Sequence, residues 1–185
     1  MKPQKGKGFA ESKLVVPVAK RDHIQGPIDA PLALLEYGDY QCPYCGDAYP
    51  VVKSVQRQLG DRLCFAFRNF PLVNSHPHAE HAAEAAEAAG AQGKFWEMHD
   101  MLFENQNALE DEDLARYAKE LSLDARRLVS EVAAGAHSAR VREDFKSGAR
   151  DGVNGTPTFF VNGVRYDGEP GVAALYAALT KANAA

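Results

Sequence analysis

Short runs of apolar residues alternate along the chain with segments whose apolar positions recur every three or four residues. Leu14–Val18 and Leu32–Tyr37 are runs of the first kind, and the second is bounded by Pro31 and Gly38. Runs of this length, rich in branched or large side chains, favour β-strands, and an uninterrupted one favours a buried strand. We therefore predict two strands before residue 40, the second of them buried.

The next segment carries the spacing of an amphipathic helix. Its apolar side chains recur four, three and four residues apart, at Ala48, Val52, Val55 and Leu59. This spacing gathers them on one helical face, and Gly60 is a typical residue at a helix end. Leu63–Phe70 is a further apolar run, closed by Pro71. A strand, a helix and a strand in this order predict a βαβ unit.

The central part of the chain, residues 72–151, predicts helices alone. Alanines recur at helical spacing between Ala79 and Ala91, and four further groups of apolar residues at helical spacing follow. No run in this stretch has the character of a strand. We interpret it as an all-helical insertion.

Strand patterns return after this stretch. Thr156–Val161 and Val164–Tyr166 flank Asn162–Gly163, and Asn-Gly between two such runs is a strong hairpin signal. Apolar positions within Val172–Leu179 then share one helical face. The chain is therefore expected to end with two strands and a helix.

Length, composition and charge exclude several classes of protein. The chain has 185 residues, 45% hydrophobic and 25% charged, as in ordinary globular proteins. Its net charge of −4 is a poor match to phosphate neutralisation, so no nucleic-acid partner is expected. No run reaches the ~18 apolar residues of a transmembrane helix, and no apolar leader core follows the N-terminal lysines. We expect no membrane span and a cytoplasmic location, or a periplasmic one if a leader has been removed.

The cysteines are placed for chemistry rather than for a disulfide scaffold. Cys42 and Cys45 form a C-x-x-C motif, while Cys64 stands alone on a predicted buried strand and is interpreted as a core residue. The motif spacing serves redox chemistry and metal binding. Pro43 suits a first helical turn, so Cys42 should lie at a helix N-terminus, which favours its thiolate. This context favours redox chemistry, because a zinc site would need further ligands.

Two other groups of residues leave alternatives open. His76, His78 and His81 cluster near the start of a predicted helix. They are either solvated or part of a metal site that includes Glu84. An aromatic stripe around Trp96 either packs in the core or lines a substrate groove beside the cysteines.

Four segments carry a resemblance to a known family: Glu36–Cys45, Arg68–Leu72, Gly93–Trp96 and Gly155–Phe159. In this order, with a long helical stretch between them, they resemble the DsbA-like thiol-disulfide oxidoreductases of the thioredoxin superfamily. The resemblance covers roughly residues 22–180. It implies an α/β protein with a thioredoxin fold, in which helices flank a central mixed β-sheet, and an all-helical insertion domain.

The resemblance also implies a division of the chain and roles for single residues. Residues 22–71 and 152–185 would form the thioredoxin-like domain and 72–151 the insertion. The basic residues crowded into positions 1–21 predict a flexible segment before them. Cys42 would be the attacking, partly exposed cysteine and Cys45 the buried resolving one. Pro157 would be in the cis form facing the pair, and Thr156 would contact the substrate. Glu36 would be a buried acid that assists proton transfer at Cys45.

The sequence thus predicts an enzyme that exchanges disulfides with protein or small-molecule thiols through its dithiol. The dipeptide between the cysteines, Pro43-Tyr44, is familiar from glutaredoxins, whereas strongly oxidising periplasmic members more often carry Pro-His. The redox direction is therefore open, and so is the identity of the redox partner. The alternatives are a non-catalytic binding or adaptor module with the same fold and a glutathione-linked cytoplasmic reductase. We expect no cofactor and no metal.

Overall fold

The computed structural model describes residues 13–169 and 171–181. In these ranges the chain forms five strands: β1 (His23–Gln25), β2 (Leu32–Gly38), β3 (Leu63–Asn69), β4 (Thr158–Val161) and β5 (Val164–Tyr166). The same ranges hold seven α-helices and one short 3₁₀ helix: α1 (Pro43–Leu59), η1 (Gly60–Arg62), α2 (Ala79–Gly90), α3 (Phe95–Glu104), α4 (Asp111–Glu120), α5 (Ala125–Ala133), α6 (Ser138–Arg150) and α7 (Val172–Lys181). From β2 onward, this order is the one that the sequence pattern predicts.

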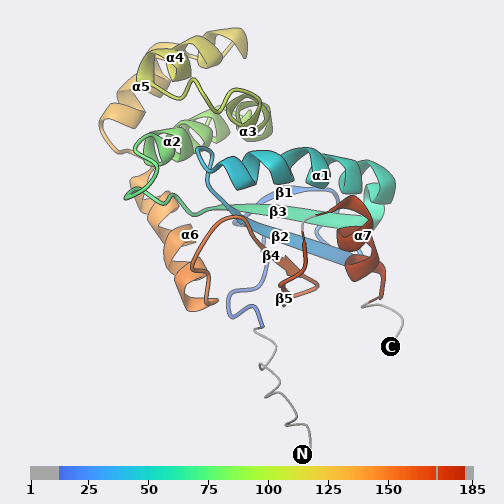
Figure 1. Cartoon of the computed structure of the whole chain (residues 1–185). Helices are drawn as coiled ribbons and strands as arrows, with labels where there is room; N and C mark the ends of the chain where they lie inside the picture. The colour runs from blue at the N-terminus through green and yellow to red at the C-terminus, as the bar shows by residue number, and fades with distance from the viewer. Residues whose placement is uncertain (1–12, 170, 182–185) are drawn as a thin grey trace, which may run out of the picture.

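The strands form one mixed sheet in the order β1-β3-β2-β4-β5 (Figure 1). β2 and β3 are parallel, from Leu32 opposite Leu63 to Gly38 opposite Asn69, and α1 connects them. The other neighbouring pairs are antiparallel. The predicted βαβ unit and mixed sheet are confirmed. Because β2 and β3 run in the same direction, both end at the side of the sheet where α1 begins.

Helices cover both faces of the sheet. α1 and α7 contact each other over one face (Figure 1), where Phe65 and Phe67 of β3 point into the main core. The buried side chains of α1 include the four predicted apolar positions, Ala48, Val52, Val55 and Leu59. α6 packs against β3 on the opposite face. Gly148 permits this approach, since an added Cβ would lie 2.7 Å from the ring of Phe70.

The helices α2–α5 gather beyond the end of the sheet at which α1 begins (Figure 1). α2 is the centre of this group, because it contacts α3, α4, α5 and α6. Its alanines between Ala79 and Ala89 are buried, and their small size lets the neighbouring helices approach closely. The helical insertion therefore stands beside the first turn of α1.

The predicted strand over Leu14–Val18 is wrong, and the edge strand is β1 instead. Side chains form hydrogen bonds with the backbone N–H and carbonyl groups of this segment, which a strand would use to pair with its neighbour. The N–H of Val15 donates to the Asp151 carboxylate at 2.6 Å, and the carbonyl of Pro17 accepts from Arg68 at 3.0 Å. Proline also has no N–H to donate to a neighbouring strand.

Of the basic segment predicted over residues 1–21, residues 1–12 lie outside the described residues. Residues 13–21 are described, and they run along the sheet and α6. Lys13 forms an isolated β-bridge with Val164, and Arg21 pairs with Glu143 of α6 at 2.6 Å. The packed part of the chain thus begins before residue 22.

Arg68 of β3 ties this segment to the sheet from a fully buried position. Its guanidinium donates to both carboxylate oxygens of Asp22, at 2.9 and 3.0 Å, and to the carbonyl of Val16 at 2.9 Å. It also donates to the hydroxyl of Tyr37 at 2.8 Å, and Tyr37 donates to Asp151 at 2.7 Å. A buried charge is tolerated when it is paired and its donors are satisfied, as they are here.

Replacing Arg68 should therefore destabilise the fold strongly. Arg68→Met leaves the Asp22 carboxylate buried without its partner, and we expect the free energy of unfolding to fall by about 3–5 kcal/mol. Urea unfolding measures this change. Arg116→Met is the matched control, because Arg116 pairs with Asp113 on the surface, and its stability should stay close to that of the unchanged protein. Equal losses in both variants would contradict the role given to Arg68.

Candidate active site

The two cysteines lie at the junction of β2 and α1. Cys42 is the N-cap residue of α1 and Pro43 is its first residue, as predicted. The carbonyl of Cys42 accepts from the N–H groups of Cys45 and Gly46, both at 3.1 Å. Proline suits this position because a first-turn N–H has no partner within the helix. Cys45 consequently lies one helical turn below Cys42.

Both cysteines are free thiols, and both are buried. Cys45 is 0% exposed, in agreement with the sequence prediction, but Cys42 is 3% exposed where partial exposure was expected. The loop before β4 covers it, since the thiol of Cys42 donates to the carbonyl of Thr156 at 3.3 Å. Tyr44, between the cysteines, is 70% exposed. Pro43, Tyr44 and the loop that contains Thr156 therefore form the accessible surface next to Cys42.

The Thr156–Pro157 peptide bond is cis in the structure, as the family resemblance implies. The pair is half-buried and lies directly before β4, next to the first turn of α1. Among the described residues, the buried hydroxyl of Thr156 has no hydrogen-bond partner. The structure thus places the carbonyl of Thr156, with Pro157 next to it, at Cys42, and contact of Thr156 with a substrate stays a prediction.

The two thiols have opposite acidities. A hydrogen bond with the Cys45 thiol, helped by Thr156 and by the N–H groups of Tyr44 and Cys45, lowers the pKa of Cys42 to about 5 against the opposing effect of burial. Burial, together with the hydrogen bond to Cys42 and the charge of Glu36, raises the pKa of Cys45 well above its usual value. A thiolate at Cys42 over a protonated Cys45 is the arrangement that thiol-disulfide exchange requires.

Glu36 lies in the central strand β2, with 2% of its surface exposed. Its Oε1 atom has no hydrogen-bond partner among the described residues. Burial, and then the charge of Cys42, raise the pKa of Glu36 to about 8. It is a buried acid beneath the cysteines, as the resemblance implies, and its role in proton transfer stays a prediction.

The sequence analysis missed the groups that fix the turn before Cys42. The carboxylate of Asp39 accepts from the N–H of Gln41 at 2.8 Å, from the N–H of Leu72 at 2.8 Å and from Nδ1 of His76 at 2.7 Å. Leu72 and His76 belong to the loop between β3 and α2. A connection between residues so far apart in the chain has no periodic signal in the sequence.

Gln106, in the loop between α3 and α4, fixes the same turn from another side. Its amide donates to the carbonyls of Tyr40 at 2.9 Å and Cys42 at 2.8 Å. Gly46 leaves the space for it, since an added Cβ there would lie 2.0 Å from the Gln106 oxygen. Gln41 in turn accepts from the N–H of His78 at 2.7 Å. The helical insertion thus holds the cysteine turn at several points.

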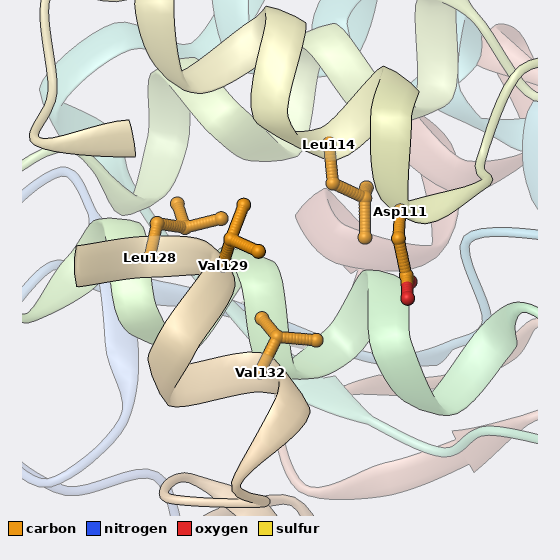
Figure 2. Close-up of a pocket in the computed structure, with 5 residues that line it drawn as sticks. All are labelled: Asp111, Leu114, Leu128, Val129 and Val132. Atoms are coloured by element: carbon orange, nitrogen blue, oxygen red, sulfur yellow. The ribbon is translucent and has the colours of Figure 1, made fainter. Parts of the chain in front are cut away.

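One pocket opens beside the cysteine turn, and a separate crevice lies within the helical insertion. A polar pocket of about 430 Å³ opens beside Pro43, between Gln41 and the loop that holds Gln106. Figure 2 shows the other, a crevice where apolar side chains of α4 and α5 converge, with Asp111 at its rim. Its volume of about 10 Å³ holds no more than one water molecule. The pocket beside Pro43 is therefore much larger than this crevice, and it lies next to the cysteine turn.

The structure shows where the clustered histidines, the aromatic stripe and Cys64 lie. Within the described residues, no three His, Cys, Asp or Glu side chains gather closely enough to hold a metal ion. His81 pairs with Asp111 at 2.7 Å instead. Trp96 is partly buried, packs against Phe65 of the core and donates to a backbone carbonyl, so the aromatic stripe packs on the core and does not line a groove. Cys64 is buried in β3, with its pKa raised by burial.

Comparison with known proteins places this site in a family. The thioredoxin family model matches residues 19–181 of the chain. The chain belongs to the thioredoxin family. Among solved structures, a thioredoxin-like oxidoreductase from Silicibacter pomeroyi is similar to this thioredoxin-family chain with a TM-score of 0.79 and 26% identity, over 90% of this chain and 95% of the other. α-DsbA1 of Wolbachia pipientis shares the fold with a TM-score of 0.76 and 18% identity, over 93% and 95% of the two chains. The predicted DsbA-like fold, a thioredoxin fold with a helical insertion, is confirmed.

Longer proteins also contain a segment similar to this thioredoxin-family chain. The Na(+)/H(+) antiporter NhaA 1 of Salinispora arenicola is 46% identical over 170 residues, which are 91% of this chain but 26% of the antiporter. The chain spans about a quarter of the length of the curated relatives it matches. Among the described residues of this chain, no helix has the length and apolar character to cross a bilayer.

The Cys42 thiol should titrate near pH 5 in the folded, reduced protein. Because this pKa lies below the unfolded value of ~8.5, ionisation stabilises the reduced protein fully above pH ~8.5, and the stabilisation is lost as the pH falls through about 5. Thiolate absorbance against pH, with Cys42→Ser as the blank, measures the midpoint. A midpoint at or above ~8.5 would contradict the proposed environment of Cys42.

Proposed function

We propose that this protein is a thiol-disulfide oxidoreductase that exchanges disulfides with protein or small-molecule thiols through Cys42 and Cys45. The observation that carries the proposal is the contrast between the two thiols. Cys42 lies at the N-cap of α1 with its pKa lowered to about 5, and Cys45 lies one turn deeper with its pKa raised. A binding module with this fold would need neither this contrast nor both cysteines.

In the first step, the Cys42 thiolate attacks one sulfur of a substrate disulfide. A bond forms between Cys42 Sγ and that sulfur, the substrate S–S bond breaks, and the other substrate sulfur leaves as a thiolate. The Cys45 thiol, with Thr156 and the N–H groups of Tyr44 and Cys45 at the start of α1, favours the attacking thiolate. At neutral pH the nucleophile is therefore already ionised.

In the second step, Cys45 resolves the mixed disulfide. Its thiol gives a proton to the Glu36 carboxylate, and its sulfur then attacks Cys42 Sγ, which releases the remaining substrate sulfur as a thiolate. A carboxyl group whose pKa is about 8 can both accept and return a proton near neutral pH. The reverse sequence of the same steps reduces the protein and oxidises a dithiol.

Substrate would approach across the exposed Tyr44 and the loop that holds Thr156 and Pro157. Thr156 and Pro157 are half-buried residues directly before β4, and an extended peptide can lie against such a segment as an added strand. Side chains next to the substrate cysteine would reach the polar pocket beside Pro43. We propose that protein or peptide substrates use this surface.

The antiporter relatives do not change this proposal. The thioredoxin model covers most of the residues that those longer proteins share with this chain, so the likeness lies in a thioredoxin-like part of them. We propose thiol chemistry for that shared part and leave ion transport to the rest of those proteins. The cytoplasmic location, or a periplasmic one if a leader has been removed, stays a prediction, and the proposal assigns no redox direction.

Removing each cysteine in turn tests the proposal. Cys45→Ala should attack oxidised glutathione and accumulate a mixed disulfide at Cys42, because the resolving thiol is absent. Cys42→Ala should form no adduct, because the two remaining thiols, Cys45 and Cys64, are buried and their pKa values are raised. Intact mass spectra after incubation read this directly, and Cys64→Ala serves as the control that should behave as the unchanged protein does. Adducts on Cys42→Ala alone would reverse the roles, and folded variants without any adduct would favour a binding module.

A further inference from the structure

A backbone N–H group is directed at the buried sulfur of the dithiol. The N–H of Asp39 donates to Sγ of Cys45 at 3.5 Å, while the carbonyl of Asp39 accepts from the N–H of Cys42 at 3.1 Å. Both hydrogen bonds lie in the turn between β2 and α1. The same residue therefore touches both cysteines through its backbone.

The side chain of Asp39 holds this backbone in place. Its carboxylate is fully buried, and it accepts hydrogen bonds from two backbone N–H groups and from Nδ1 of His76. A carboxylate oxygen can only accept, so His76 must donate. Hydrogen bonds to an ionised group are stronger than those between neutral groups. Hydrogen bonds from the turn itself and from the helical insertion thereby fix the position of Asp39.

This N–H group matters most when Cys45 becomes negatively charged. Burial is the main cause that raises the pKa of Cys45, and the hydrogen bond from the Asp39 N–H acts against it. Cys45 must lose its proton during resolution, and a donor that is already aimed at the sulfur stabilises the developing charge without reorganisation. A less fixed turn would offer this donor less often.

We propose that Asp39 and His76 form a positioning pair, which holds the Asp39 N–H against Cys45 Sγ and thereby speeds resolution of the mixed disulfide. The inference rests on the proposed function, since it concerns the second step of that reaction. His76 touches neither sulfur and acts only through Asp39. The pair thus links the helical insertion to the chemistry of the buried cysteine.

Variants at His76 separate its hydrogen bond from its bulk. His76→Phe keeps a ring without a donor, His76→Ala removes both, and His76→Asn keeps a donor near the position of Nδ1. The reduced proteins are mixed with oxidised glutathione, quenched with acid and followed by mass spectrometry, which gives separate rates for adduct formation and adduct resolution. His81→Ala is the matched control, since it removes a histidine–aspartate pair of the same length on the surface of the insertion.

We expect His76→Phe and His76→Ala to slow adduct resolution by roughly tenfold, the effect of losing about one charge-assisted hydrogen bond. Adduct formation by Cys42 should change by less than about twofold, whereas a general loss of structure would slow both steps. His76→Asn and His81→Ala should resolve at nearly the rate of the unchanged protein.

Two results would overturn the inference. The first is resolution at the unchanged rate in a folded His76→Phe or His76→Ala protein, and the second is equal slowing in His76→Asn. Cys45→Ala, run in parallel, distinguishes failure of the inference from failure of the proposed function. If Cys45→Ala forms the glutathione adduct but the His76 variants resolve normally, the positioning pair alone is wrong. If Cys45→Ala forms no adduct, the proposed exchange reaction is wrong as well.

Discussion

The turn between β2 and α1 carries buried polar backbone groups, and each such group needs a partner. The carboxylate of Asp39 and the amide of Gln106 supply several of these partners, and His76 holds Asp39 from the insertion. A thioredoxin-like sheet can present a helix start by itself. In this protein, the position of that start also depends on the helices inserted between β3 and β4. The insertion therefore helps to position the cysteine turn.

Three ionisable groups lie close together at this site in different surroundings. Cys42 lies at a helix N-terminus, Cys45 lies below it away from solvent, and Glu36 is buried in the central strand of the sheet. Their pKa values are pushed apart, to about 5 for Cys42 and about 8 for Glu36, with that of Cys45 raised. On the opposite face, the buried Arg68 network fixes β2 through Tyr37. β2 thus directs Glu36 toward one face of the sheet and Tyr37, which binds Arg68, toward the other.

The sequence predicts what depends on local periodicity and on short motifs. The spacing of Val52, Val55 and Leu59 predicts α1, and the motif with Pro43 predicts a cysteine at its N-cap. The sequence pattern does not predict contacts between distant side chains, and the strand expected before residue 20 failed because Arg68 and Asp151 take its backbone groups. For the same reason the covering of Cys42 by the Thr156 loop and the partners of Asp39 were missed.

The reduction potential of the Cys42/Cys45 pair tests the central claim most directly, namely that the helix start stabilises the reduced, ionised form of a dithiol redox centre. A lowered pKa at Cys42 favours the reduced form and raises the potential. Equilibration with reduced and oxidised glutathione should show one two-electron transition between about −270 and −120 mV, the values for thioredoxin and DsbA. A potential more negative than about −270 mV, or no reversible transition of a folded protein, would contradict the account.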